Sequence, residues 1–224
     1  MTLYAASTWV IPIIIAVTFH EAAHGFVARL FGDDTAWRMG RVTFNPLKHI
    51  DAVGTIFLPG LLLLLRSPFL FGYAKPVPVN FAALRDPRRD MIWVALAGPA
   101  TNIALALLAA LTFHLIGFIP TMAAQWIARN LPNTLVINVV LAVFNMLPLP
   151  PLDGGRVAVG LLPDAIAVPL ARLEPYGMII LLGVLFIVPI LGAQMGVDLS
   201  VVTWVIGRAT NAIIDVILEV TGHS

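Results

Sequence analysis

The feature that most limits how this chain can fold is a series of long apolar runs, the first of which extends from about Leu3 to Leu30. About 20 apolar residues are enough to cross the hydrocarbon core of a bilayer as a helix. Hydrophobic residues make up 59% of the 224 residues and charged residues only 11%, whereas about a quarter of a typical soluble domain is charged. We therefore expect an all-α, polytopic membrane protein with no sizeable soluble domain.

Later apolar runs extend this prediction. They cover about residues 91–119, 134–149, 176–195 and 199–220. Together with a shorter run at 52–65, they predict about five to six transmembrane helices in a single membrane-embedded domain, residues 1–224. The last run carries charged residues on one helical stripe, so it either spans with that stripe facing inward or lies in the membrane interface. The stripe consists of Arg208, Asp215 and Glu219.

Charge and cysteine content exclude several classes of function. The net charge is +1, which gives no electrostatic signal for a nucleic-acid partner. The chain has no cysteine, which excludes disulfides and a thiolate metal site and leaves histidine and carboxylate as plausible metal ligands. Its first residues lack the positive region of a cleaved signal peptide, so we expect the first run to be retained as a span.

Basic residues predict the orientation of the chain. Basic residues stand at the C-terminal end of the first run and after it: Arg29, Arg38, Arg41 and Lys48. The positive-inside rule therefore places its C-terminal end near the cytoplasm and its N-terminus outside. Residues 52–65 would cover only about 21 Å of a core of about 30 Å, with basic loops on both sides, so we expect a re-entrant segment. Residues 37–45 partly alternate polar and apolar side chains, which predicts a short membrane-associated β-strand or hairpin.

Three polar residues interrupt the first apolar run near its C-terminal end: His20, Glu21 and His24. On a helix, His20 and His24 share one face and can hold two corners of a tetrahedral zinc site. Glu21 lies beside them, where a carboxylate can act as general base in a metal-assisted hydrolysis. A soluble helix could carry two such histidines as ordinary surface residues. In an apolar helix, however, ionisable side chains are costly and are retained mostly for function.

A catalytic zinc site with two histidines needs a third protein ligand and one open position. Asp153 is the best candidate, because it follows a proline-rich break and precedes two glycines that allow a tight bend. Taken alone, the same residues also fit an ordinary turn at a helix end. If residues 52–65 spanned fully, Asp153 would emerge on the face opposite His20 and His24. A re-entrant segment would instead place all three on one side.

Three motifs, in this order, resemble the site-2 protease family of intramembrane zinc metalloproteases, peptidase family M50. They are His20-Glu21-x-x-His24, Gly98-Pro99-x-x-Asn102 and Asn145-x-x-Pro148-x-x-x-Leu152-Asp153-Gly154-Gly155. The resemblance covers a catalytic core of about residues 10–160, while the C-terminal helices at about 176–220 carry no recognised motif. Segments 45–51 and 72–80 look like the short prokaryotic branch, in which we expect neither a PDZ nor a CBS domain.

The resemblance implies that His20, His24 and Asp153 bind one Zn²⁺ per chain and that Glu21 is the general base. It also implies that Asn145 helps to bind substrate or the developing oxyanion, and that Asn102 gives polar support near the site. The expected substrate is a transmembrane protein or peptide in the lipid bilayer of a prokaryotic cell membrane, cleaved towards the cytoplasmic side. The predicted strand at 37–45 could hold an unwound substrate by strand addition.

A second interpretation is a non-proteolytic membrane protein with a structural or transported metal ion. A transporter would be expected to show inverted repeats and further acidic ligands, and a structural zinc would have four protein ligands. The sequence shows no repeat and no convincing fourth ligand. A membrane metallohydrolase acting on another amide or ester remains a third interpretation, because the chemistry is the same. We interpret His114, in the outer half of a predicted span, as a packing residue.

Overall fold

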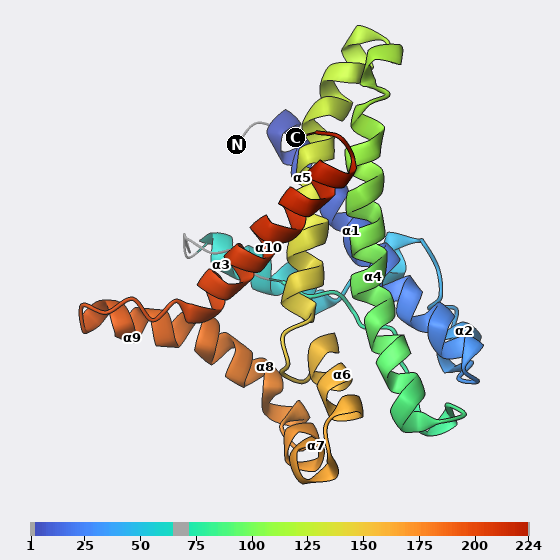
Figure 1. Cartoon of the computed structure of the whole chain (residues 1–224), viewed down its shortest axis with the longest axis vertical. Coiled ribbons are helices and arrows are strands. Elements are labelled where there is room, and N and C mark those ends of the chain that lie inside the picture. The colour runs from blue at the N-terminus through green and yellow to red at the C-terminus, as the bar shows by residue number, and fades with distance from the viewer. Residues whose placement is uncertain (1–2, 65–71, 224) are drawn as a thin grey trace.

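Three long helices form the centre of the structure, a computed structural model that describes residues 3–64 and 72–223. They are α1 (Leu3–Leu30), α4 (Pro87–Phe113) and α5 (Thr121–Asn145), and each contacts the other two (Figure 1). The described residues contain five helical stretches long and apolar enough to cross a membrane, in agreement with the predicted all-α membrane protein. These are Ser7–Leu30, Pro87–Phe113, Ala123–Asn145, Glu174–Gln194 and Val201–Val220.

Helix α4 begins where its sequence supplies helix-start signals. Pro87 takes the first position, where its missing N–H costs nothing. The side chain of Asp86 accepts a hydrogen bond from the N–H of Arg89 at 3.3 Å, and the carboxylate of Asp90 accepts one from the N–H of Asp86 at 2.9 Å. These bonds satisfy donors that the first turn of a helix leaves unpaired, so they define where α4 starts.

Small side chains let the central helices approach closely. Ala106 and Ala110 of α4 pack against Leu135 and Val139 of α5, and Ile217 from the C-terminal helix closes the cluster. Within a bilayer, helices associate through close packing and not through a hydrophobic driving force, because lipid tails are as apolar as the side chains. The alanines of α4 therefore bring α5 close enough for polar groups on the two helices to meet.

The predicted β-hairpin at residues 37–45 is wrong. The described chain there consists of the end of α2 (Thr35–Arg38), a turn and a bend, without a strand. Asp33, which is 1% exposed, favours the helical turn because its carboxylate accepts a hydrogen bond from the first N–H of α2 at 2.9 Å. Arg41 then donates to two backbone carbonyls of segment 72–80, at 2.9 and 3.2 Å. Bonds between side chains and backbone thus replace a strand ladder.

The predicted re-entrant segment is not supported as such. Its described residues form one helical stretch, η2 (Ala52–Phe57) followed by α3 (Leu58–Leu64), and residues 65–71 lie outside the described part of the chain. The two ends of this excursion are nevertheless paired, since the N–H of Tyr73 donates to the carbonyl of Gly54 at 3.1 Å. A Cβ on Gly54 would lie within 2.5 Å of Tyr73, so this pairing requires glycine. Gly54 and Tyr73 therefore lie side by side.

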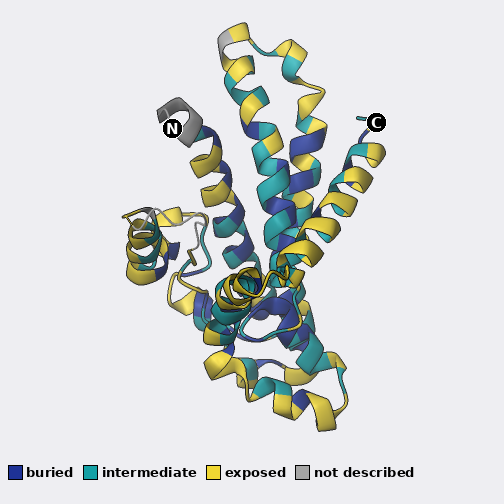
Figure 2. Cartoon of the chain, turned by 90° about the vertical axis from the view of Figure 1, so that its left-hand side faces the viewer, coloured by how far each residue is buried: buried dark blue, intermediate teal, exposed yellow. Residues whose placement is uncertain are grey.

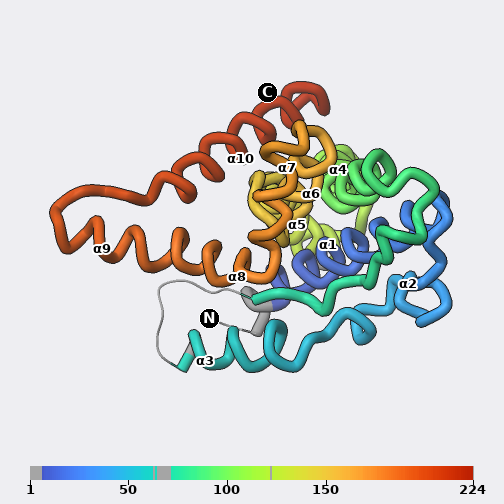
Figure 3. Tube along the Cα trace, turned by 90° about the horizontal axis from the view of Figure 1, so that it is seen from below, coloured from blue at the N-terminus to red at the C-terminus, as the bar shows by residue number. Residues whose placement is uncertain are grey.

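The C-terminal part begins below the bundle and then extends away from it. Helices α6 (Asp153–Leu161) and α7 (Asp164–Ala171) follow α5 at its lower end (Figure 1). The next apolar stretch points away from the bundle and α10 returns, as seen from below in Figure 3. That stretch consists of α8 (Glu174–Leu182), η5 (Gly183–Ile187) and α9 (Val188–Gln194), and it precedes α10 (Val201–Val220).

Helix α10 carries its charged stripe on the outside. Arg208, Asp215 and Glu219 are all exposed, so the arrangement in which the stripe faces inward is wrong; Figure 2 shows exposed positions along this helix, which ends at the C-terminus. The opposite side of α10 packs against α5. Just beyond α4, the ring nitrogen Nε2 of His114 donates to the carbonyl of Thr221 at 2.7 Å. His114 is exposed, this hydrogen bond links the end of α4 to the end of α10, and the cluster of possible metal ligands among the described residues does not include it.

Candidate metal centre

Two helices bring three of the predicted site residues together. His20 and His24 lie one turn apart on α1, and Asp153 is the first residue of α6. The two Nε2 atoms are 3.1 Å apart, and Asp153 Oδ2 lies 3.2 Å from that of His20 and 3.4 Å from that of His24. All three residues are buried. The sequence predicted this grouping, although Asp153 lies more than a hundred positions from the two histidines along the chain.

The spacing of the three ligand atoms fits a tetrahedral zinc ion. Zinc–ligand distances of about 2.0–2.1 Å require about 3.3–3.4 Å between neighbouring ligand atoms of a tetrahedron. The observed separations of 3.1, 3.2 and 3.4 Å are close to that value. Three protein ligands also leave one corner open, which is typical of a catalytic zinc site and not of a structural one.

The protons around the cluster also favour a cation between the three atoms. His24 Nδ1 lies 2.7 Å from the backbone carbonyl of Val94, which can only accept, so this nitrogen carries the hydrogen and Nε2 presents a lone pair. The carboxylate of Asp153 lies against both Nε2 atoms. Its Oδ2 is buried without a hydrogen-bond donor among the described residues. Lone pairs this close need a positive charge between them.

Gly98 of α4 makes room for both histidines. A Cβ at this position would lie 2.5 Å from His20 Cε1 and 2.5 Å from His24 Nε2. Any other residue would therefore push the imidazoles out of the cluster. The motif Gly-Pro was visible in the sequence, but nothing in the sequence shows that its glycine faces the histidines.

Asp153 is placed by close backbone packing around the first turn of α6. A Cβ on Gly154 would lie 2.2 Å from the carbonyl oxygen of Met146, and one on Gly155 would lie 2.2 Å from the nitrogen of Pro150. The two glycines therefore let α6 begin directly against the loop that ends α5. This loop fixes the direction in which the Asp153 carboxylate points.

Arg88, at the start of α4, holds the other end of α6. Its Nε donates to the carbonyl of Gly160 at 3.1 Å, and another guanidinium nitrogen donates to the carbonyl of Leu162. The guanidinium also forms an ion pair of 2.7 Å with Asp164. Both ends of the helix that carries Asp153 are thus tied to neighbouring elements. Only the structure shows that a basic residue at the start of α4 clamps α6.

Glu21 is oriented by a backbone donor. Its Oε2 accepts a hydrogen bond from the N–H of Val77 at 2.7 Å. Val77 stands between Pro76 and Pro78, which have no N–H and cannot enter a helix interior, so the segment runs extended past α1. Sequence reasoning missed this contact because it joins a side chain to a distant backbone, although the alternating prolines indicated an extended segment.

Two predicted amide residues differ in their surroundings. Asn102 of α4 lies against the metal cluster, with its Oδ1 2.6 Å from Nδ1 of His20. Asn145, at the end of α5, donates its amide to the carbonyl of Leu141 on its own helix at 3.0 Å. The structure thus brings Asn102 to the site, while the oxyanion role of Asn145 stays a prediction.

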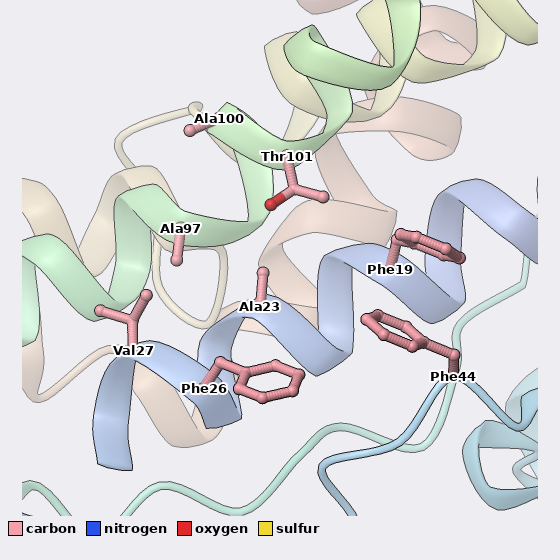
Figure 4. A pocket seen from close by; sticks show the side chains of 8 residues that line it. All are labelled: Phe19, Ala23, Phe26, Val27, Phe44, Ala97, Ala100 and Thr101. Carbon is pink, nitrogen blue, oxygen red and sulfur yellow. The ribbon is translucent and has the colours of Figure 1, made fainter. Parts of the chain in front are cut away.

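An apolar pocket of about 420 Å³ lies between α1 and α4 (Figure 4), and its lining includes Phe19 and Ala23, which precede His20 and His24 in the sequence. Phe19 and Phe44 stack at its edge with ring centroids 4.4 Å apart, and Phe26 lies beside them. Small side chains of α4, Ala97 and Thr101 among them, form the opposite wall. Phe44 belongs to the segment predicted as a strand, so that segment reaches α1 through aromatic packing.

Comparison with known proteins places the chain in a family. The sequence profile described as Peptidase family M50 matches residues 8–120 and 114–188. The chain is 39% identical over 188 residues to "Putative zinc metalloprotease YwhC" of Bacillus subtilis, which covers 81% of this chain and 80% of that protein. It is 31% identical over 191 residues to "Putative zinc metalloprotease Rip2" of Mycobacterium tuberculosis, which covers 85% of this chain and 70% of that protein. No solved structure matches it.

These similarities cover most of the chain, including all three motifs and the residues that form the candidate metal centre. The donor set of two imidazoles and one carboxylate agrees with the zinc named in both relatives. The chain belongs to peptidase family M50, the site-2 protease family of zinc metalloproteases.

Proposed function

We propose that this protein hydrolyses peptide bonds in or near transmembrane segments of other membrane proteins. His20, His24 and Asp153 are the zinc ligands, Glu21 is the general base, and the whole chain acts as one membrane-embedded domain. The observation that carries the proposal is the buried cluster of three ligand atoms with separations of 3.1–3.4 Å, in which both histidines lie on a helix long and apolar enough to span a membrane.

When bound, zinc polarises the scissile carbonyl and makes water a stronger nucleophile near neutral pH. Glu21 takes the proton from the attacking water and passes it to the leaving amine. The N–H of Val77 holds Oε2 of this carboxylate, and among the described hydrogen bonds Oε1 has no protein donor, so Oε1 is the atom that handles the proton. Because Val77 has fixed the carboxylate in advance, little reorganisation is needed during the reaction.

Asn145 is the proposed donor to the developing oxyanion. Its amide uses one hydrogen on the carbonyl of Leu141, which leaves the second hydrogen for a substrate oxygen. A donor aimed at the position where negative charge develops stabilises the transition state more than the ground state. Asn145 is the last residue of α5, the helix that leads into the loop before Asp153.

The substrate must unwind before its backbone can reach the site, because helix carbonyls are occupied by internal hydrogen bonds. Residues 37–45 form no strand, so this segment does not offer a strand edge to which an unwound substrate could add. The apolar pocket between α1 and α4 is instead a candidate place for an apolar side chain of the substrate (Figure 4). Its lining suits residues that are common in transmembrane segments, such as leucine or phenylalanine.

The proposed orientation has the metal centre towards the cytoplasmic side of a prokaryotic cell membrane. The centre lies near the C-terminal end of α1, which is followed by the basic residues Arg38 and Arg41. By the positive-inside rule, this end of the bundle faces the cytoplasm. Water would then have only a short path to the site.

Zinc content and cleavage of a single-span test substrate in detergent would test the proposal. We compare the native protein with Glu21→Gln, and with Glu219→Gln on the exposed face of α10 as the matched control. One zinc per chain in all three proteins, with cleavage lost only in Glu21→Gln, is the expected result. Zinc without cleavage by the native protein would favour a structural or transported metal. A native protein without zinc would refute the metal site itself.

A further inference from the structure

A row of buried amides runs from the first histidine through the centre of the bundle. Oδ1 of Asn102 lies 2.6 Å from Nδ1 of His20. Nδ2 of Asn102 lies 2.8 Å from Oδ1 of Asn138 on α5 and 3.2 Å from the carbonyl oxygen of Ala16 on α1. Nδ2 of Asn138 in turn lies 2.8 Å from the carbonyl oxygen of Thr134. Both asparagines are fully buried, with 0% exposure.

The direction of each hydrogen bond in this row can be assigned from the carbonyl of Thr134, at the end of the row that lies away from His20. The carbonyl of Thr134 can only accept, so the atom of Asn138 that faces it is the amide nitrogen. The amide oxygen of Asn138 must then accept from Nδ2 of Asn102, and the carbonyl of Ala16 independently requires the same orientation of that amide. Oδ1 of Asn102 therefore faces His20 as an acceptor, so Nδ1 of His20 carries the hydrogen.

We propose that Asn102, held in place by Asn138, is a positioning residue that fixes the hydrogen of His20 on Nδ1 and so presents the Nε2 lone pair to the metal. This inference rests on the proposed zinc ligands. A metal-binding histidine is generally oriented by a hydrogen bond from its other ring nitrogen, usually to a carboxylate or carbonyl. Here an uncharged amide takes that role, which suits a fully buried position on a helix long and apolar enough to span a membrane, where a carboxylate would be costly.

A purely structural role is the competing explanation. Hydrogen bonds between polar side chains also join helices within membranes, so the same amides could do no more than hold α1, α4 and α5 together. The two explanations differ in what they predict for metal affinity and for the protonation of the His20 ring. They also differ in the expected effect of replacing the two asparagines together.

The test measures zinc affinity by competition with a chelator and the ¹⁵N resonances of the histidine rings in the metal-free protein. We expect Asn102→Ala to weaken zinc binding about 10–100-fold, because the orienting acceptor is lost. Asn102→Asp keeps an acceptor for Nδ1–H and should bind zinc more tightly than Asn102→Ala. The recovery should be partial, because the second oxygen of the carboxylate faces two acceptors, the carbonyl of Ala16 and Oδ1 of Asn138. In Asn102→Ala, the His20 resonances should show hydrogen on both ring nitrogens in exchange, whereas Asn102→Asp should keep it on Nδ1.

Asn130→Ala is the matched control. Asn130 lies on α5 two turns before Asn138 and donates to the carbonyl of Trp126 at 2.8 Å, the same type of bond that Asn138 makes to Thr134. Its Oδ1 has no partner among the described residues, so it does not continue towards the metal. This variant loses the same bond within α5 as Asn138→Ala, and it should keep native zinc affinity and native His20 resonances.

The double variant Asn102→Ala/Asn138→Ala tests whether the two residues act in series. If Asn138 acts only through Asn102, the double variant binds zinc no more weakly than Asn102→Ala alone. Additive losses would overturn the proposed series. Native zinc affinity in Asn102→Ala would overturn the positioning role while leaving the proposed metal site intact. Absence of zinc from the native protein would instead refute the proposed function.

Discussion

Gly98→Ala is predicted to remove the metal centre while leaving the helix that carries it intact. The added methyl group would lie 2.5 Å from atoms of both His20 and His24, whereas ordinary contact begins at 3.4 Å. The imidazoles or α4 must therefore move by about 0.9 Å, several times the tolerance of about 0.2 Å for ligand distances in a zinc site. Alanine is a better helix former than glycine by about 1 kcal/mol, so poorer helix formation cannot explain a loss.

The expected size of the effect follows from the loss of ligand geometry. Overpacking of this kind costs about 1–3 kcal/mol of folding stability. Displacement of the two imidazoles from their corners of the zinc tetrahedron should weaken zinc binding by at least about 100-fold, since loss of an outer-shell partner alone weakens it about 10–100-fold. A 100-fold loss corresponds to about 2.7 kcal/mol of binding free energy.

The assay is zinc affinity by chelator competition, combined with helicity by circular dichroism and thermal unfolding. Gly207→Ala is the matched control, because this glycine is also within a helix and a Cβ there meets nothing within 4 Å. We expect Gly207→Ala to keep native zinc affinity and to be equally or slightly more stable. Native zinc affinity in Gly98→Ala would show that the histidines are not packed against α4 as described, and the reasoning would fail.

Three further outcomes are expected. Arg88→Gln should lower the unfolding free energy by about 1.5–3 kcal/mol and weaken zinc binding, because two carbonyls at the end of α6 lose a charged donor. The control Asp164→Asn removes only an exposed ion pair and should lower the unfolding free energy by less than about 1 kcal/mol. Gly155→Ala should prevent α6 from packing on the Pro150 loop, and a native melting temperature in this variant would contradict that contact. Chelation should lower the unfolding free energy by about 2.7 kcal/mol relative to protein with zinc at 100 times its Kd, and added zinc should reverse it. An unfolding temperature that does not depend on zinc would contradict the expected stabilisation by the metal.

Sequence reasoning worked where a property belongs to a single segment. The length and apolarity of each run identify the spans, because crossing a bilayer requires a minimum length of apolar helix. The helical spacing of His20 and His24 places them on one face wherever that helix packs. Sequence also singled out Asp153, since a carboxylate between a proline-rich break and two glycines stands at a tight bend.

Only the tertiary structure decided which distant groups meet. Backbone packing around Gly98 and Gly155 brings Asp153 to the histidines, and the backbone of Val77 orients Glu21. Residues 37–45 do not form a strand because Arg41 donates to the distant backbone of Lys75, and Asp33 accepts from the N–H of Thr35, two residues ahead. The alternation of polar and apolar residues does not reveal either hydrogen bond. The physical reason is that hydropathy and helical period are local, whereas the direction of a hydrogen bond and the room for a side chain depend on how separate helices pack.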